Sequence, residues 1–286
     1  MAQIINTNLV SLNAQRNLSG TNSQVALAMQ RLSSGLRVNS AKDDAAGLAI
    51  SERMNSQVRG MNVAIRNAND GISLAQVAEG ALGKIGDMLQ RMRELAVQSS
   101  NATNGDSDRL NLDAEFQQLS AEVNRTISGS KFNGLQILAD DAGDLVFQVG
   151  ANTTVDDRIT ITTNQLSTDS AVTDLTGGPG FAGAPPSDLK TLDNSQDAIG
   201  KIDTLLDVVN SNRADYGAAQ NRFEAVIANL QVSSENQAAA RSRIMDADFA
   251  AETAALTRAQ VLQQAGTAML AQANQAPQTV LRLLQG

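Results

Sequence analysis

The chain has 286 residues, enough for one large or two ordinary domains, and it carries a formal net charge of −8. It contains no cysteine and no histidine, which excludes disulfides, thiolate metal sites and the commonest general base of enzymes. Aromatic residues make up 2% of the sequence, so alanine and aliphatic side chains must supply the burial, a composition that suits close helix packing. The acidic balance argues against nucleic acid as a partner.

Charge is distributed unevenly along the chain. No acidic residue precedes Asp43 and none follows Glu252, so all 30 acidic residues lie between these two positions. Residues 259–281 carry no charge, yet their many amide side chains argue against a membrane span. The first residues lack the basic and apolar regions of a secretory signal. Uncharged, amide-rich segments at both ends are therefore predicted to be buried against other protein.

Residues 2–36 predict a helix with an apolar stripe close to the heptad period. Its apolar residues recur mostly at steps of four and three: Ile5, Leu9, Leu12, Val25, Met29, Leu32 and Leu36. Gly20 and the many serine and asparagine residues weaken this helix, so we expect it to be marginal in water by itself.

The stretch RLSSGLRVNSAKDDAAGLAIS at residues 31–51 predicts a joint between two helices. Gly35 fits the glycine that ends a helix, and Ser40-x-x-Asp43 fits a capping box that starts the next one. A metal site is disfavoured because no third ligand lies nearby, and a phosphate loop would need a different glycine and lysine pattern.

A long helix is predicted for residues 44–99, followed by a turn at Asn104-Gly105 and a shorter helix from Leu112. A straight helix of that length measures about 80 Å, which predicts an elongated molecule. Arg91, Leu95 and Gln98 share the face opposite the predicted core residues, and two interpretations stay open. This face is either solvated, with one stray leucine, or a contact between subunits.

Beyond residue 130 the apolar period changes from helix to strand. Residues 145–149 and 158–162 alternate like a β-hairpin, and Asn133-Gly134 marks a turn. Residues 163–188 are rich in Ser, Thr, Gly and Pro, so we expect an exposed loop outside the core. The aspartates near 106–108 and in the hairpin connections are interpreted as turn and cap residues because nothing apolar encloses them.

Helical spacing returns at residues 188–235 and again at 245–284, with Asp246 or Asp248 as the N-cap of the last helix. The predicted fold is mainly α: an elongated antiparallel coiled-coil rod with a small β-hairpin region and with its N- and C-terminal helices paired. The apolar residues that we expect to pack in the C-terminal helix are Leu256, Leu262, Met269, Leu270, Val280, Leu281 and Leu284.

Several ordered motifs resemble those of bacterial flagellins, the subunits of flagellar filaments. They are IINTN at 4–8, the joint at 31–51, LQRMRELAVQSSN at 89–101, RSRIMDADFAAE at 241–252 and RAQVLQQAGTAMLAQANQAPQTVLRLL at 258–284. The resemblance covers roughly 1–165 and 190–286. It implies a short form without large outer domains, divided into an N-terminal axial helix and linker (1–43), a rod with its hairpin (44–165), a short outer loop (166–188), a returning rod helix (189–240) and a C-terminal axial helix (241–286).

The resemblance also implies a function and partners. The expected protein is a structural, non-enzymatic subunit without cofactors, exported by a type III apparatus and polymerised outside the cell for motility. Its implied partners are other copies of itself, an export chaperone, the filament cap, hook-junction proteins and a host Toll-like flagellin receptor. The implied receptor face, which should also pack between subunits in the filament, consists of Gln90, Arg91, Leu95, Gln98 and Glu115. The closest alternative is a hook–filament junction protein with similar ends.

Overall fold

The structure, a computed structural model, describes residues 7–178 and 186–285, with side chains up to residue 275. Its helices and strands confirm the predicted mainly α class. In chain order they are α1 (Leu9–Ser34), α2 (Ala45–Ser99), α3 (Asp106–Gly129), β1 (Lys131–Phe132), β2 (Leu135–Gln136), β3 (Asp144–Gln148), η1 (Val155–Asp157), β4 (Arg158–Thr162), η2 (Leu166–Thr168), α4 (Ser170–Thr176), α5 (Leu192–Met245) and α6 (Phe249–Gln285).

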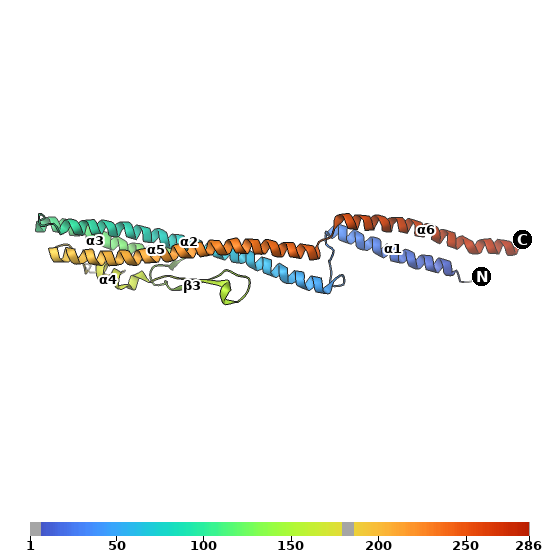
Figure 1. Cartoon of the computed structure of the whole chain (residues 1–286), viewed down its shortest axis with the longest axis horizontal. Helices are drawn as coiled ribbons and strands as arrows, with labels where there is room; N and C mark the ends of the chain where they lie inside the picture. Colours follow the sequence, from blue (N-terminus) through green and yellow to red (C-terminus); the bar gives the residue numbers. More distant parts are fainter. Residues whose placement is uncertain (1–6, 179–185, 286) are drawn as a thin grey trace. The chain divides into compact units, whose positions relative to one another are not determined.

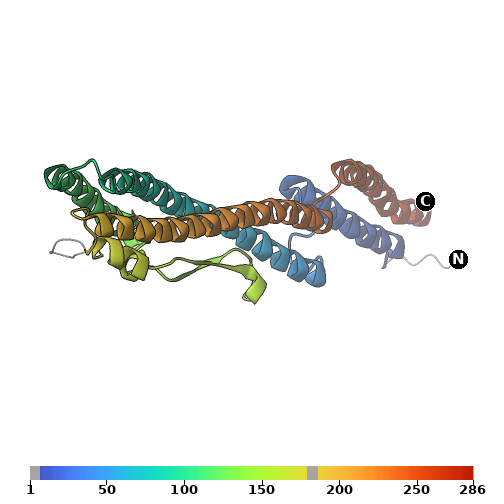
Figure 2. The same ribbon diagram turned by 60° about the vertical axis from the view of Figure 1, so that its left-hand side comes forward.

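The chain divides into two compact units, one made from its two ends (residues 1–56 and 236–286) and one from residues 57–235. In the first unit, α1 and α6 run side by side in opposite directions (Figures 1 and 2). The predicted pairing of the N- and C-terminal helices is therefore confirmed. None of the described helices is long and apolar enough to cross a lipid bilayer.

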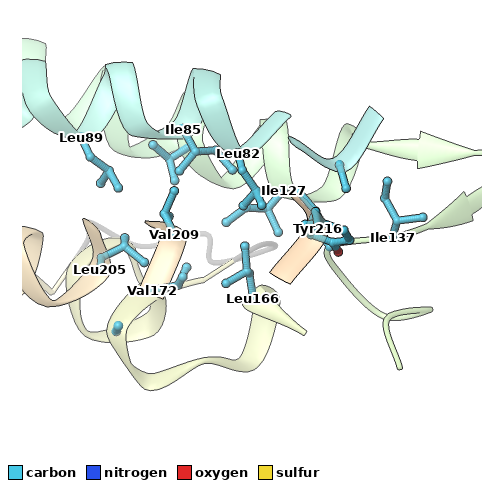
Figure 3. Packing of buried hydrophobic residues seen from close by; sticks show 14 of the residues in the cluster. Leu82, Ile85, Leu89, Ile127, Ile137, Leu166, Val172, Leu205, Val209 and Tyr216 are labelled. Atoms are coloured by element: carbon cyan, nitrogen blue, oxygen red, sulfur yellow. The ribbon is translucent and has the colours of Figure 1, made fainter. Parts of the chain in front are cut away.

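In the second unit, α2, α3 and α5 pack around an aliphatic core, with α4 and the strands alongside (Figures 1 and 3). This core agrees with a composition poor in aromatic residues. Side chains fully or almost fully buried in it come from α2, α3, η2, α4 and α5: Leu82, Ile85, Leu89, Ile127, Leu166, Val172, Leu205, Val209 and Tyr216.

Two antiparallel hairpins follow α3. The first pairs β1 with β2 around Asn133 and Gly134, whose φ angles of 50° and 87° are those of a tight turn for which Asn-Gly is the preferred sequence. The second pairs β3 with β4 and confirms the predicted hairpin. Along β4, Ile159 and Ile161 are each 4% exposed while their neighbours face outward, so the alternating sequence buries one face of this hairpin.

The larger hairpin is held against the helices by close packing and by a hydrogen bond from α2. Phe147 of β3 meets Phe223 of α5 edge to face, with ring centroids 5.5 Å apart. Gly71 of α2 leaves room for the Phe223 ring, since a Cβ at this position would lie 2.7 Å from it. The Asn67 amide donates to the carbonyl oxygen of Gln148 at 2.9 Å.

The expectation that residues 163–188 stay outside the core is wrong for the part up to Thr176. Leu166, Val172 and Leu175 are each 0–1% exposed, and α4 is capped by Asp169 and ended by Gly177. The helix has only seven residues, too few to show a helical period among the surrounding polar residues. The domain boundaries at 43, 165, 188 and 240 remain predictions.

Candidate assembly and recognition surfaces

The α1·α6 pair has a seam in which small and polar side chains outnumber leucine and valine residues. The less exposed residues recur at steps of three and four, as in a coiled coil. They are Ser11, Ala14, Leu18, Thr21, Val25, Ala28 and Leu32 on α1, and Glu252, Leu256, Ala259, Gln263, Gly266, Leu270 and Ala273 on α6. The two helices approach closely where side chains are absent, since a Cβ on Gly266 would lie 3.3 Å from Leu18.

Polar contacts fix the register of this pair. The Ser11 hydroxyl donates to Oδ1 of Asn274 at 2.8 Å, and the Gln263 amide donates to Oδ1 of Asn22 at 2.8 Å. Near the other end of the pair, Arg31 and Glu252 lie 3.7 Å apart as an ion pair. Contacts of this kind are made in only one alignment, so they specify register more than they add stability.

Large apolar side chains of the same two helices point away from the seam and stay exposed. We call them the outer apolar faces: Leu9, Val10, Leu12, Leu27 and Met29 on α1, and Phe249, Val261, Leu262 and Met269 on α6. Their exposed fractions range from 39% for Leu27 to 67% for Val10. A shallow groove between the helices is lined in part by Leu27 and Leu262.

The predicted packing residues of the end helices therefore divide into separate groups. Val25, Leu32, Leu256 and Leu270 are half-buried in the seam. A second group lies outside the seam, on the outer apolar faces: Leu9, Leu12, Met29, Leu262 and Met269. The side chains of the remaining four lie outside the described part of the structure: Ile5, Val280, Leu281 and Leu284.

The joint between α1 and α2 matches its prediction at Gly35 but differs from it at the start of α2. Gly35 ends α1 with a φ of 70°, and its N–H donates to the carbonyl of Arg31 at 2.8 Å. The carboxylate of Asp43 accepts from the Ser40 hydroxyl at 3.0 Å and from the Ser40 N–H at 2.9 Å, and these bonds lower the pKa of Asp43. The predicted capping box at Ser40 is wrong, because these residues close a separate turn before the helix begins.

The residue that caps α2 is Asp44, whose Oδ1 accepts from the N–H of Gly47 at 2.8 Å. Asp248 caps α6 in the same way, accepting from the N–H of Ala250 at 2.9 Å. The joint between α1 and α2 also contacts the joint between α5 and α6, since the Arg37 N–H donates to the carbonyl of Met245 at 2.7 Å. Both joints are thus fixed by backbone as well as side-chain hydrogen bonds.

A second candidate surface lies where α2 meets α3. The Arg91 guanidinium forms ion pairs with Glu94 on its own helix and with Glu115 on α3, each at 2.9 Å. Hydrogen bonds to Glu94 and Glu115 raise the pKa of Arg91. Gln90 and Gln98 are exposed on the same stretch of α2. We call Gln90, Arg91, Gln98 and Glu115 the α2–α3 face.

The prediction that Leu95 is exposed on this face is wrong. Its side chain is 1% exposed and belongs to the core of residues 57–235. The reason is that α2 packs against two helices: Arg91 contacts α3, while Arg93 pairs with Asp203 of α5 at 2.7 Å. The buried arc between these arginines is wider than the single seam of a two-helix coiled coil, and it includes both Leu95 and Ala96.

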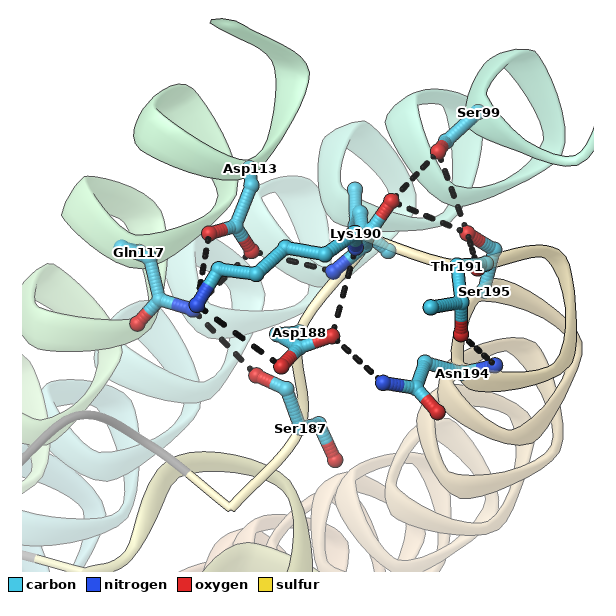
Figure 4. A network of polar contacts seen from close by, with 10 residues as sticks. Ser99, Asp113, Gln117, Ser187, Asp188, Lys190, Thr191, Asn194 and Ser195 are labelled. Carbon is cyan, nitrogen blue, oxygen red and sulfur yellow. Dashed lines mark hydrogen bonds and ion pairs between the residues drawn. The ribbon is translucent and has the colours of Figure 1, made fainter. Parts of the chain in front are cut away.

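Polar side chains that sequence reasoning missed fasten the start of α5 to the ends of α2 and α3 (Figure 4). The backbone of Leu189 is held from both sides: its carbonyl accepts from Ser99 at 2.8 Å and its N–H donates to Asp113 at 3.0 Å. Asp113 is 6% exposed and also accepts from the Gln117 amide. No local sequence signal marks this network, because Leu189 lies 90 residues from Ser99 and 76 residues from Asp113.

Nothing in this arrangement resembles a catalytic centre. Within residues 7–178 and 186–285, no three acidic side chains converge as metal ligands. The features that stand out are paired end helices with apolar outer faces, joined to a helical unit with a solid aliphatic core. These features are those of a structural protein.

Comparison with known proteins identifies the family. The description "Bacterial flagellin N-terminal helical region" matches residues 5–142, and "Bacterial flagellin C-terminal helical region" matches residues 199–284. The chain is 48% identical over 285 residues to "Flagellin" of Halalkalibacterium halodurans, covering 99% of this chain and 100% of the relative. It is 41% identical over 292 residues to "Flagellin FlaB1" of Treponema pallidum, with coverage of 99% and 100%.

A solved structure described as a flagellar hook-associated protein from Vibrio parahaemolyticus shares the fold, with a TM-score of 0.58. It covers 71% of this chain and all of its own, but the sequence identity is 11%, so this likeness concerns the fold alone.

The chain belongs to the bacterial flagellin family. It is a subunit of the flagellar filament, a structural component of the extracellular flagellum that serves motility, and not an enzyme. The full-length similarity to flagellins favours this role over the alternative of a hook–filament junction protein.

Proposed function

We propose that this subunit enters the filament by burying the outer apolar faces of its α1·α6 pair against neighbouring copies. One observation carries the proposal: besides the leucine and valine residues in the seam, nine large apolar side chains of the two helices lie outside it and stay exposed. Burying apolar surface contributes roughly 25 cal/mol per Å², so these side chains favour association. Another copy is the partner because filament subunits polymerise with themselves.

The proposal extends to the arrangement of the chain within the filament. Residues 1–43 and 241–286 form the inner part, residues 44–165 and 189–240 form the rod around it, and residues 166–188 face outward. The absence of acidic residues before Asp43 and after Glu252 supports this order, because buried carboxylates are costly. An export chaperone, the filament cap and hook-junction proteins complete the proposed partners, on the strength of the sequence resemblance.

Seeded growth tests the assembly proposal. Subunits dissociated by acid or heat are returned to neutral buffer with short filament fragments and viewed by electron microscopy. We expect long tubes to grow from the fragments. A folded, soluble protein that leaves the fragments at their original length would refute self-assembly.

A second proposed role is recognition by a host Toll-like flagellin receptor through the α2–α3 face. Its support is that Arg91, Glu115 and their neighbours Gln90 and Gln98 are exposed together on two adjacent helices. Leu95 is buried, so we assign it a supporting role beneath this face. The charged pair offers groups that a partner can bind by hydrogen bonds.

A receptor reporter assay tests this role with the variants Arg91→Ala and Glu115→Ala. We expect both to signal more weakly than the unmodified subunit. Arg125→Ala is the matched control, because Arg125 also forms an exposed ion pair, with Glu122 on α3. Equal signals from all four proteins would exclude the proposed face.

A further inference from the structure

Methionine is the principal oxidisable side chain that this subunit exposes. The sequence has no cysteine, tryptophan or histidine, and its single tyrosine, Tyr216, is 2% exposed. Of the seven methionines in the described residues, Met61, Met92 and Met245 are buried, while Met54 and Met88 are half-buried. The remaining two are much more exposed than these five: Met29 is 56% exposed and Met269 is 65% exposed.

These two exposed methionines both belong to the outer apolar faces. Met29 follows the seam residue Ala28 on α1, and Met269 precedes the seam residue Leu270 on α6. Both therefore flank the seam without entering it, so a change in their polarity leaves the contacts between α1 and α6 in place. The same change alters the surface that neighbouring copies cover in the proposed filament.

We propose that Met29 and Met269 are oxidation sites through which a peroxide blocks assembly of the free subunit. This inference rests on the assembly proposed above. In the reaction the methionine sulfur attacks hydrogen peroxide, the O–O bond breaks, one oxygen stays on the sulfur as a sulfoxide and the other leaves as water. The sulfur is oxidised by two electrons and the peroxide is reduced by two.

The sulfoxide acts on assembly because it is polar and chiral where the thioether was apolar and flexible. In the free subunit water solvates the new oxygen, so the fold is unaffected. In the filament that oxygen is buried, and a buried polar group without a hydrogen-bond partner is unfavourable. Neighbouring copies also shield both sulfurs, so the assembled subunit reacts more slowly than the free one.

The test treats free subunits and intact filaments with hydrogen peroxide, removes the peroxide with catalase, and locates sulfoxides by peptide mass spectrometry. Portions of the treated subunits then grow on untreated filament fragments. The variant Met29→Leu/Met269→Leu keeps both side chains apolar and similar in volume but not oxidisable in this way. The matched control is Met54→Leu/Met88→Leu, which replaces two half-buried methionines and leaves Met29 and Met269 in place.

We expect oxygen to appear first at Met29 and Met269, faster in free subunits than in filaments. Seeded growth should fall by roughly tenfold or more in the unmodified protein and in the Met54/Met88 control, with unchanged helical circular dichroism. The Met29/Met269 variant should keep its growth rate, and methionine sulfoxide reductases should restore growth of the oxidised wild type.

Two results would overturn the inference: oxidation of the buried methionines before Met29 and Met269, or loss of growth in the Met29/Met269 variant after the same treatment. The latter result would point to another residue, Met1 included. The order of oxidation is measured on folded subunits and does not depend on growth. Failure of untreated subunits to grow is a separate result and counts against the assembly proposal.

Discussion

At the scale of single residues, Tyr216 shows the effect of burying one polar atom in an aliphatic core. Its ring is 2% exposed among residues of α2, α3 and α5, and its hydroxyl has no hydrogen-bond partner in the described part of the chain. Burial, together with the nearby charge of Asp215, raises the pKa of Tyr216 to about 12. The neutral phenol is therefore the form that the fold tolerates.

We predict a stability change at alkaline pH from this single side chain. The unfolded pKa is about 10, so the stabilising contribution is complete below about pH 10 and is lost as the pH rises towards the folded value. Tyrosinate absorbance reports the titration without interference, since the chain has no tryptophan and no other tyrosine. The control Tyr216→Phe should remove this part of the pH dependence. Ionisation of Tyr216 near pH 10 with intact helical circular dichroism would contradict a raised pKa for this residue.

At the scale of elements, the hairpin and the long helices depend on one another through Gly71. This glycine lies inside α2 and leaves the space that the Phe223 ring fills, while Phe223 in turn receives Phe147 from β3. Glycine inside a helix costs about 0.5–1 kcal/mol relative to alanine, so its presence here is explained by packing.

The variant Gly71→Ala should therefore lose stability despite its better helix propensity. Overpacking a core costs about 1–3 kcal/mol, which exceeds the propensity gain in most of that range. Gly80→Ala is the matched control on the same helix, where nothing lies within 4 Å of an added Cβ. In urea unfolding, the free energy of unfolding should be higher for Gly80→Ala than for the unmodified protein, and lower for Gly71→Ala. Equal shifts in both variants would contradict the packing argument.

The register of the α1·α6 pair gives a second prediction at this scale. Because the chain has no cysteine, the pair Ser11→Cys and Asn274→Cys would hold its only two thiols. We expect a disulfide within one chain, since the two side chains are already in contact at 2.8 Å. Ser11→Cys with Thr267→Cys, two turns away along α6, is the control.

Non-reducing electrophoresis of denatured filaments separates the outcomes. A disulfide within one chain gives a compact monomer band, whereas a bond between copies gives a dimer. The register shown by the structure predicts the compact band for the 11/274 pair alone. A compact band from the 11/267 pair, or dimers from the 11/274 pair, would mean that α1 and α6 align differently.

The sequence predicted the helices and the larger hairpin because their apolar periods are long and regular. The sequence did not predict burial correctly where it depends on how many other helices pack against an element. Leu95 was assigned to an exposed face on the assumption of one seam along α2, but packing against both α3 and α5 widens the buried arc. The short helix α4 was missed because seven residues show too little of a period.

The candidate surfaces were predictable only in part. The sequence predicts one packing set for the large apolar residues of α1 and α6, whereas only some of them lie in the seam and several stay exposed. Helical periodicity alone does not show which of two neighbouring stripes of residues on a helix packs in the seam and which stays exposed. The resemblance to flagellins places Arg91 and Glu115 on one face, but their ion pair was not predicted, since no local rule joins residues on different helices.

At the scale of the whole molecule, the two units differ in how much of their apolar surface is buried within one chain. Residues 57–235 bury their aliphatic side chains within one chain, around a core that includes Leu82, Leu89 and Val209. The α1·α6 pair buries side chains only along its seam, and its outer apolar faces stay exposed.

The most direct test of this account compares Leu262→Gln with Leu110→Gln in seeded filament growth. The two leucines are 50% and 55% exposed, but Leu262 belongs to the outer apolar faces and Leu110 lies on α3. Burying a leucine contributes about 1.5–3 kcal/mol, so Leu262→Gln should slow growth roughly tenfold or more, with unchanged circular dichroism of the free subunit. Leu110→Gln should grow like the unmodified protein. Equal growth of both variants would contradict the claim that the outer apolar faces drive assembly.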